Sequence, residues 1–163
     1  MGTGESGNYY TSGGSRTVHH PALIHSIDGG FTHDQKTGRP ERLKSGGHGQ
    51  GSMDVMGRNH IEYNVVKTYK NGVRIGNVPK HKNALKQTGG MQAWFPRSWS
   101  AHDIVKAGEY VVSLKSNQGV PDGVTMWGTY KGVRVGVKTT DGRIATIFPC
   151  LEQPGQIMGR KQQ

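Results

Sequence analysis

Two of the eight histidines lie in surroundings that suit chemistry on a phosphate. His33 follows the run Gly29-Gly30-Phe31-Thr32, and His48 lies within Ser45-Gly46-Gly47-His48-Gly49. Glycines beside a polar side chain let the backbone of a ligand come close to it. The two histidines are 15 positions apart, and four cations between them would attract phosphate: Lys36, Arg39, Arg42 and Lys44.

Cleavage of RNA by transesterification needs a base for the 2′-hydroxyl proton, an acid for the departing 5′-oxygen and a cation for the phosphorane. Two imidazoles and one ammonium meet these needs without a metal, because histidine can act as base or acid near neutral pH. Two other interpretations of the pair stay open. The histidines are bystanders in a loop, or they bind a metal with Asp34 or Asp54, although no HExxH-like spacing occurs.

The composition favours a polyanionic partner. The chain has 163 residues and a formal charge of +10, and nucleic acid is the commonest partner of such a chain. A solubilising surface or an acidic protein partner would also fit this charge. The single cysteine, Cys150, excludes an internal disulfide and a cysteine-based zinc cluster. No run of 18 apolar residues predicts a membrane span, and the first 15 residues lack the hydrophobic core of a signal peptide.

The elements that must position these residues suggest one domain with polar ends. Residues 1–20 are rich in Gly and Ser and are predicted to be a flexible linker, residues 21–149 the domain, and residues 150–163 a tail. Within the domain, residues 21–58 show little hydrophobic periodicity and many glycines. A long irregular loop is usually functional or disordered, and because this one carries both histidines we expect a Gly-rich catalytic segment.

Regular structure is expected from Ile61 onward. Residues 61–68 and 73–78 are predicted to pair as a hairpin around Asn71-Gly72, and residues 80–88 to form a short helix. Residues 100–114 have an apolar helical face, with Ser100 as N-cap and Asp103 in the capping-box position. Residues 124–130, 132–139 and 143–149 are predicted to form a meander. The fold class is therefore α+β, with two small antiparallel sheets and one amphipathic helix.

Three segments together resemble the EndoU family of uridylate-preferring endoribonucleases. The first runs from His33 through Leu43-Lys44-Ser45-Gly46-Gly47-His48 and resembles the family's spaced histidine pair. Ala93-Trp94-Phe95-Pro96-Arg97-Ser98-Trp99-Ser100 resembles its bacterial FP-x-x-W element, and Ile144-Ala145-Thr146-Ile147-Phe148-Pro149 its terminal T-x-Y-P strand. We assign Phe95 and Trp99 to the core, although both, like Trp94 and Trp127, could stack on bases.

The resemblance implies the residues of the site. His33 and His48 match the catalytic histidines, with the choice of acid and base open. Lys86 matches the lysine that stabilises the phosphorane, with Lys82 as the alternative, and Thr146 matches a hydroxyl residue that binds uracil or phosphate. Phe148 replaces the family's Tyr, which keeps a stacking face and loses a hydrogen bond. The expected substrate-binding residues are Ser45, Gly47, Thr88 and Phe148; no metal or other cofactor is expected.

The bacterial branch of the family also implies a biological setting. The reaction would leave a 2′,3′-cyclic phosphate and a 5′-hydroxyl on RNA, often tRNA. Such domains are commonly C-terminal toxins of larger secreted proteins, delivered into neighbouring cells in contact-dependent inhibition and blocked by an immunity protein. The Gly/Ser start fits a segment of such a protein. Three rival functions are a non-catalytic RNA-binding module, a metal-dependent nuclease and a DNA-directed toxin.

Overall fold

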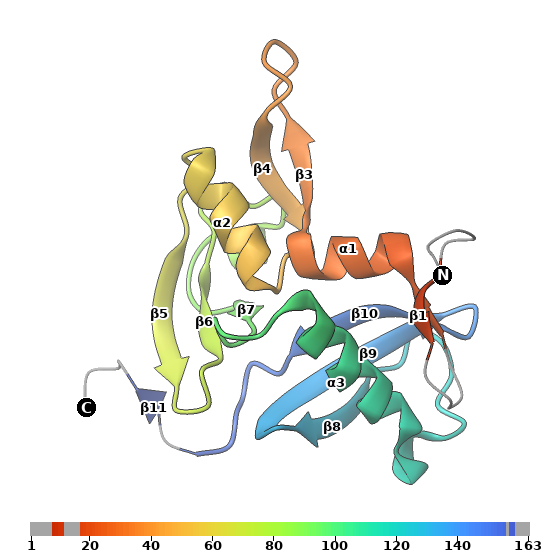
Figure 1. The fold of residues 1–163 in the computed structure, drawn as a ribbon. Coiled ribbons are helices and arrows are strands. Elements are labelled where there is room, and N and C mark those ends of the chain that lie inside the picture. The colour runs from red at the N-terminus through yellow and green to blue at the C-terminus, as the bar shows by residue number, and fades with distance from the viewer. Residues whose placement is uncertain (1–7, 12–16, 156, 159–163) are drawn as a thin grey trace.

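The computed structural model describes residues 8–11, 17–155 and 157–158, and within them the chain forms three α-helices and three small sheets (Figure 1). The predicted α+β class is confirmed, but the sheets number three in this part of the chain and not two. In chain order the elements are β1 (Asn8–Thr11), β2 (Thr17–His19), α1 (His20–Asp28), β3 (Gly30–His33), β4 (Pro40–Ser45), α2 (Gln50–Arg58), β5 (Asn64–Tyr69), β6 (Arg74–Asn77), η2 (Ala84–Lys86), β7 (Gln92–Trp94), α3 (Ala101–Ser113), η3 (Lys115–Asn117), β8 (Met126–Tyr130), β9 (Val133–Thr140), β10 (Arg143–Pro149) and β11 (Ile157–Met158).

The largest sheet has the strand order β1-β2-β10-β9-β8, and α3 covers one of its faces (Figure 1). The predicted meander is confirmed as β8, β9 and β10. The predicted helix is confirmed too: the Ser100 side chain accepts from the Asp103 backbone N–H, and the Asp103 carboxylate accepts from the Ser100 N–H. A capping box gives hydrogen-bond partners to backbone N–H groups that the first helical turn leaves unpaired. The main core lies between helix and sheet and includes Ile104, Val111, Val135, Val137 and Ile147.

The second sheet, β11-β5-β6-β7, contains the predicted hairpin of β5 and β6. Gly72 closes its turn with φ +99, a conformation that favours glycine. The helix predicted over residues 80–88 shrinks to the 3-10 turn η2. Two facts explain this: Asn83 caps the turn through the Leu85 N–H, and Leu85 is 70% exposed. The segment therefore has no apolar face to bury, and short helices need one to be stable.

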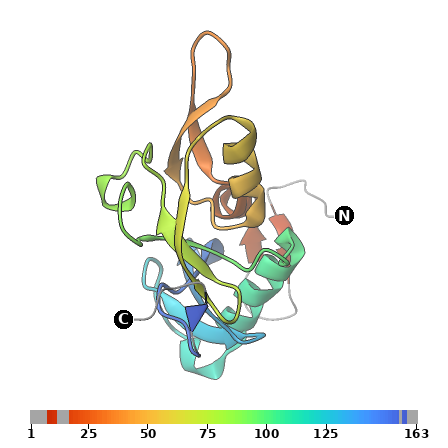
Figure 2. The ribbon, with the colours of Figure 1, turned by 90° about the vertical axis from the view of Figure 1, so that its left-hand side faces the viewer.

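The segment 21–58, predicted as a long irregular loop, is mostly regular. It holds α1, the hairpin of β3 and β4, and α2, and the hairpin projects from the body (Figure 2). The sequence did not predict α2 because glycine normally disfavours helices. In this helix glycine is needed for space, since a Cβ at Gly51 would lie 2.9 Å from Asp28 Oδ1. Gly51 thus permits α2 to pack closely on α1. The buried faces of β4 and α2 form a second core with Leu43, Met53, Met56, Ile61, Val78 and Trp94.

The two predicted ends are partly built into the fold. In the predicted linker, β1 pairs with β2, and β2 adds to β10 through the parallel pair Val18 and Ile144; residues 1–7 and 12–16 lie outside the described residues. In the predicted tail, Gln153 is buried and its side-chain amide donates to the Arg134 and Cys150 carbonyls. The Tyr69 hydroxyl donates to the Leu151 carbonyl. Residues 150–155 therefore pack across β5 and β9. Among the described residues, no helix has the length and apolarity to cross a membrane.

Candidate active site

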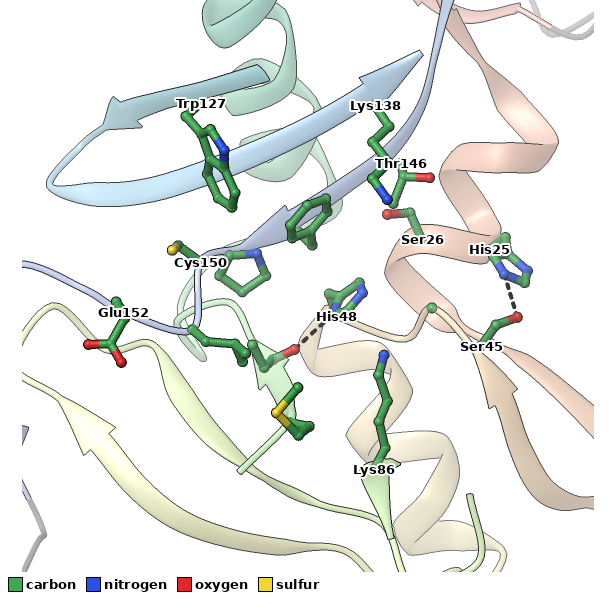
Figure 3. Close-up of a pocket in the computed structure, with 16 residues that line it drawn as sticks. His25, Ser26, Ser45, His48, Lys86, Trp127, Lys138, Thr146, Cys150 and Glu152 are labelled. Carbon is green, nitrogen blue, oxygen red and sulfur yellow. Dashed lines mark hydrogen bonds between the residues drawn. The ribbon is translucent and has the colours of Figure 1, made fainter. Parts of the chain in front are cut away.

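A pocket of about 510 Å³ lies where α1, the segment after β4, the segment before β7 and the sheet of β8, β9 and β10 meet (Figure 3). It is lined by His25, Ser26, Ser45, Gly46, His48, Lys86, Met91, Ala93, Trp127, Lys138, Thr146, Phe148, Pro149, Cys150, Leu151 and Glu152. A pocket of this size suits a ligand as large as a nucleotide. The predicted residues His48, Lys86, Thr146, Ser45 and Phe148 are thus brought together.

His48 is held by three hydrogen bonds. Its backbone N–H donates to the Ser26 carbonyl at 2.8 Å, and its carbonyl accepts from the Phe95 N–H at 2.8 Å. Its ring Nδ1 lies 2.8 Å from the Ala93 carbonyl oxygen. The chain reaches this position through Gly46 at φ +68, where a Cβ would overlap the His25 carbonyl oxygen. The glycines before His48 therefore let the segment run against the C-terminal turn of α1.

The contact with Ala93 fixes the proton on the ring. A carbonyl oxygen can only accept, so Nδ1 must carry the hydrogen and Nε2 of the neutral ring keeps its lone pair. Burial is the largest cause that lowers the pKa of His48 to about 4; the hydrogen bond to Ala93 opposes it, and the nearby Lys86, His25 and His81 contribute smaller lowering effects. Near neutral pH, His48 is a neutral imidazole whose Nε2 is free to accept a proton.

The second imidazole in the pocket is His25 and not the predicted His33. His25 is exposed near the end of α1, and its Nε2 lies 2.7 Å from Ser45 Oγ. Its ring is flanked by glycines: a Cβ at Gly30 would lie 2.9 Å from its Cε1, and one at Gly46 3.1 Å from its Cδ2. His33 is exposed at the outer end of β3 and does not line the pocket. The strands of the projecting hairpin carry it away from His48.

Lys86 enters the pocket from η2, and Figure 3 shows its side chain extending toward His48. Its backbone is fixed by the Val78 N–H, which donates to the Lys86 carbonyl at 2.9 Å. Burial lowers the pKa of Lys86. Partial removal of water strengthens the attraction between its ammonium and a phosphate. Lys82, the alternative lysine, is exposed and does not line the pocket.

A β-bulge aims two side chains of β10 into the pocket. The register with β9 shifts between Ile144 and Thr146, so Ala145 is the extra residue. A bulge reverses the alternation of a strand. Ile144 and Ile147 therefore both face the core, while Thr146 and Phe148 line the pocket. The bulge therefore sets which side chains of the T-x-F-P segment face the pocket and which face the core.

Aromatic rings form one wall of the pocket. The Phe148 ring lies 6.1 Å from the His48 ring and 5.7 Å, edge to face, from the Trp127 ring. Both Phe148 and Trp127 lie over Gly136, where a Cβ would come within 2.7 Å of Phe148. The Arg134 guanidinium stacks on Trp127 at 5.0 Å. Phe95 and Trp99, by contrast, stack on each other in the main core, as predicted. Trp94 is buried in the second core.

Two predicted substrate-binding residues lie outside the pocket lining. Gly47 is buried behind it, where a Cβ would lie 2.6 Å from Ser52 Oγ. Thr88 is exposed after η2. Several residues that line the pocket were not predicted to belong to it, among them His25, Ser26 and Lys138. His25 ends the apolar run Ala22-Leu23-Ile24, so a histidine at the edge of a regular element was the available signal.

The described residues contain no group of three or more His, Cys, Asp or Glu side chains arranged to hold a metal. The only carboxylate among the residues that line the pocket is Glu152, which Figure 3 places at the far end from His25. The groups that can act on a ligand are therefore two imidazoles of different exposure, two lysine ammoniums, hydroxyls and an aromatic wall.

A family model described as bacterial EndoU nuclease matches residues 20–151. The matched stretch begins at α1 and ends just after β10, so it contains every residue of the pocket except Glu152. No curated protein and no solved structure matches the chain.

Proposed function

The chain belongs to the bacterial EndoU nuclease family and is an endoribonuclease, and we propose that it cuts RNA after uridine by metal-independent transesterification. One observation carries the mechanism. His48 holds its hydrogen on Nδ1 against Ala93, which leaves Nε2 open toward a pocket that also contains His25 and Lys86. Residues with these three roles are what the reaction requires.

In the first step, His48 Nε2 removes the proton from the ribose 2′-hydroxyl. The 2′-oxygen then attacks the phosphorus, and the phosphorane gains a negative charge. Lys86 stabilises that charge, since a lysine ammonium is a compact point charge in a partly dried site. The ribose lies against Phe148, whose ring is next to that of His48.

In the second step, the bond from phosphorus to the 5′-oxygen breaks and His25 gives that oxygen a proton. His25 suits the acid role because it is the other imidazole that lines the pocket and its exposed ring can exchange protons with water. Ser45 Oγ holds its ring in place. The two rings differ in burial, and such a difference separates acid from base in one site. The products are a 2′,3′-cyclic phosphate and a 5′-hydroxyl.

The decisive experiment incubates the purified chain with total tRNA in EDTA and maps the ends of the products. We expect cleavage after uridines, ends with a cyclic phosphate, and strongly reduced cleavage by His48→Ala and His25→Ala. Loss of activity in EDTA would favour a metal-dependent nuclease. Cleavage of a 2′-deoxy substrate would favour the DNA-directed toxin. Binding of RNA without cleavage would favour the RNA-binding module.

We also propose that the nuclease acts as a toxin domain of a larger delivered protein, with tRNA as its target and an immunity protein as its inhibitor. The bacterial branch of the family and the charge of +10, which suits an acidic inhibitor, support this. Expression of the chain in bacterial cytoplasm is expected to arrest growth and release tRNA fragments that end in a cyclic phosphate. Expression of His48→Ala is the control. Unimpaired growth with active, soluble nuclease present would contradict the toxin role.

A further inference from the structure

Lys138 is a second ammonium in the pocket, and the mechanism above gives it no role. It lies on β9, on the face of the sheet opposite α3, and is the register partner of Thr146. Its neighbours Val137 and Thr139 point to the other face and are buried, whereas Lys138 is exposed. Figure 3 shows its side chain extending into the pocket from the sheet, while Lys86 extends into it from the opposite side.

The charges of the pocket are unevenly distributed. The ammoniums of Lys86 and Lys138 lie toward the end of the pocket that holds His25, whereas the carboxylate of Glu152 lies toward the other end, beyond Trp127 and Cys150 (Figure 3). Among the described residues, no hydrogen bond or ion pair occupies the Lys138 ammonium. Two like charges that face one space repel each other unless an anion lies between or beside them. Lys86 already interacts with the scissile phosphate in the proposed mechanism. Lys138 can therefore bind a second anionic group.

The assignment of acid and base gives the RNA a direction in the pocket. The ribose that loses its 2′-proton lies at His48, and the leaving nucleotide lies at His25. Lys138 belongs to the His25 side, because Ser26, the neighbour of His25, exchanges two hydrogen bonds with the backbone of Ile147. The Oγ–H donates to the Ile147 carbonyl at 2.7 Å and accepts from the Ile147 N–H at 2.9 Å. Ile147 follows Thr146, which pairs with Lys138.

We propose that Lys138 binds the phosphate on the 3′ side of the leaving nucleotide. The site would make the enzyme favour a chain that continues past the scissile bond over one that ends there. This inference rests on the proposed function, because it uses the direction that His48 and His25 impose on the RNA. A charge-assisted contact of this kind is worth about tenfold in affinity or in kcat/KM at low salt.

Two dinucleotides that differ only in this phosphate test the proposal. UpA ends in a 3′-hydroxyl, and UpAp carries the additional 3′-phosphate. We expect wild type to cleave UpAp with a kcat/KM about tenfold above that for UpA at low salt. Lys138→Ala should reduce this preference to less than about twofold while changing the cleavage of UpA by less than about threefold. Lys138→Arg should keep most of the preference.

The matched control is Lys115→Ala, which removes the same charge from an exposed residue of η3 outside the pocket. It should keep the wild-type preference. Three outcomes overturn the proposal: no preference in wild type, a preference that survives in Lys138→Ala, or an equal loss on both substrates. The last would assign Lys138 to the scissile phosphate.

A binding measurement separates this inference from the proposed function. The analogues dUpA and dUpAp lack the 2′-hydroxyl and resist cleavage, so their dissociation constants report the phosphate contact alone. We expect wild type to bind dUpAp about tenfold more tightly, and Lys138→Ala to lose that difference. If wild type cleaves no RNA, the proposed function fails and this measurement still decides on Lys138. Equal binding of the two analogues by wild type overturns the proposal.

Discussion

The segment that carries His48 and the hairpin that carries His33 look alike in sequence and differ in the fold. Both histidines follow glycines, and cations lie between them. His48 is 9% exposed and fixed by hydrogen bonds to Ser26, Phe95 and Ala93, whereas His33 is exposed at the outer end of a projecting strand. A histidine therefore becomes part of a site when other elements of the fold hold its ring in place, and the spacing along the chain does not reveal those contacts.

Substitution of each histidine by alanine should give very different losses of activity. His48→Ala removes the proposed base, and we expect kcat/KM on a uridine-containing RNA to fall about 10³-fold or more, since general acid–base groups contribute up to about 10⁴. His33→Ala should stay within about twofold of wild type, because surface substitutions far from a site have little effect. Initial rates with a fluorescent oligonucleotide measure both. A large loss in His33→Ala would show that the hairpin closes on the pocket.

The acid and base roles are separated by the leaving group. We expect His25→Ala to lose about 10²-fold or more on RNA, because the 5′-oxygen departs poorly without a proton. Uridine 3′-(p-nitrophenyl phosphate) releases a stable phenolate that needs no proton. On this substrate His25→Ala should regain most of the wild-type rate, and His48→Ala should remain impaired. Rescue of His48→Ala in place of His25→Ala would reverse the two assignments.

Sequence patterns predicted the fold where elements are long enough to show a period. The apolar face and capping box of α3 and the alternating strands β8 to β10 were all visible, because thirteen or so residues of helix, or paired strands with tight turns, leave repeated signals. The helices α1 and α2 have nine residues each and were missed. In α2 the buried residues are Ser52, Met53 and Met56, and glycines stand where close packing against α1 requires them.

The site was predicted in part for the same reason. Five predicted residues line the pocket: His48, Lys86, Thr146, Ser45 and Phe148. They could be predicted because each lies in or near a segment with a recognisable local motif. His25 was not predicted, since its place depends on the long-range contact of Gly46 and Gly47 with the C-terminal turn of α1. Lys138 was missed because its direction depends on the strand register of β9 against β10. Contacts between distant segments leave no periodic signal in one sequence.

The buried ring of His48 should also give the pH profile a distinctive acidic limb. A base must be neutral, so activity is lost as the pH falls through the pKa of His48, which burial lowers to about 4. With an ordinary pKa of 6.5, the neutral form of the base would be about 25-fold less abundant at pH 5 than at pH 7. We expect the limb that His48 controls in kcat/KM to lie near pH 4, as measured with a dinucleotide from pH 3.5 to 8. An acidic limb near pH 6.5 would show that the His48 ring is hydrated and that its pKa is not lowered.

His81 is a second buried histidine, and its burial should affect the stability of the fold. His81 is buried, accepts from the Asn83 N–H through Nδ1, and has its pKa lowered to about 4, first by burial and then by Lys86 and Arg42. The stability that its neutral form contributes is therefore fully present above pH 6.5 and is lost as the pH falls toward 4. The reason is that His81 binds a proton in the unfolded chain at a higher pH than in the folded chain.

His81→Asn keeps an acceptor for Asn83 and removes the titration. Between pH 7 and 4.5 the unfolding free energy of the variant should fall by about 1–2 kcal/mol less than that of wild type, as measured by denaturant unfolding at each pH. The comparison of two proteins cancels the opposite contribution of Glu109, whose pKa burial raises to about 7. Parallel pH dependence in the two proteins would mean that His81 is protonated in the fold, and that its burial beside Lys86 does not keep it neutral.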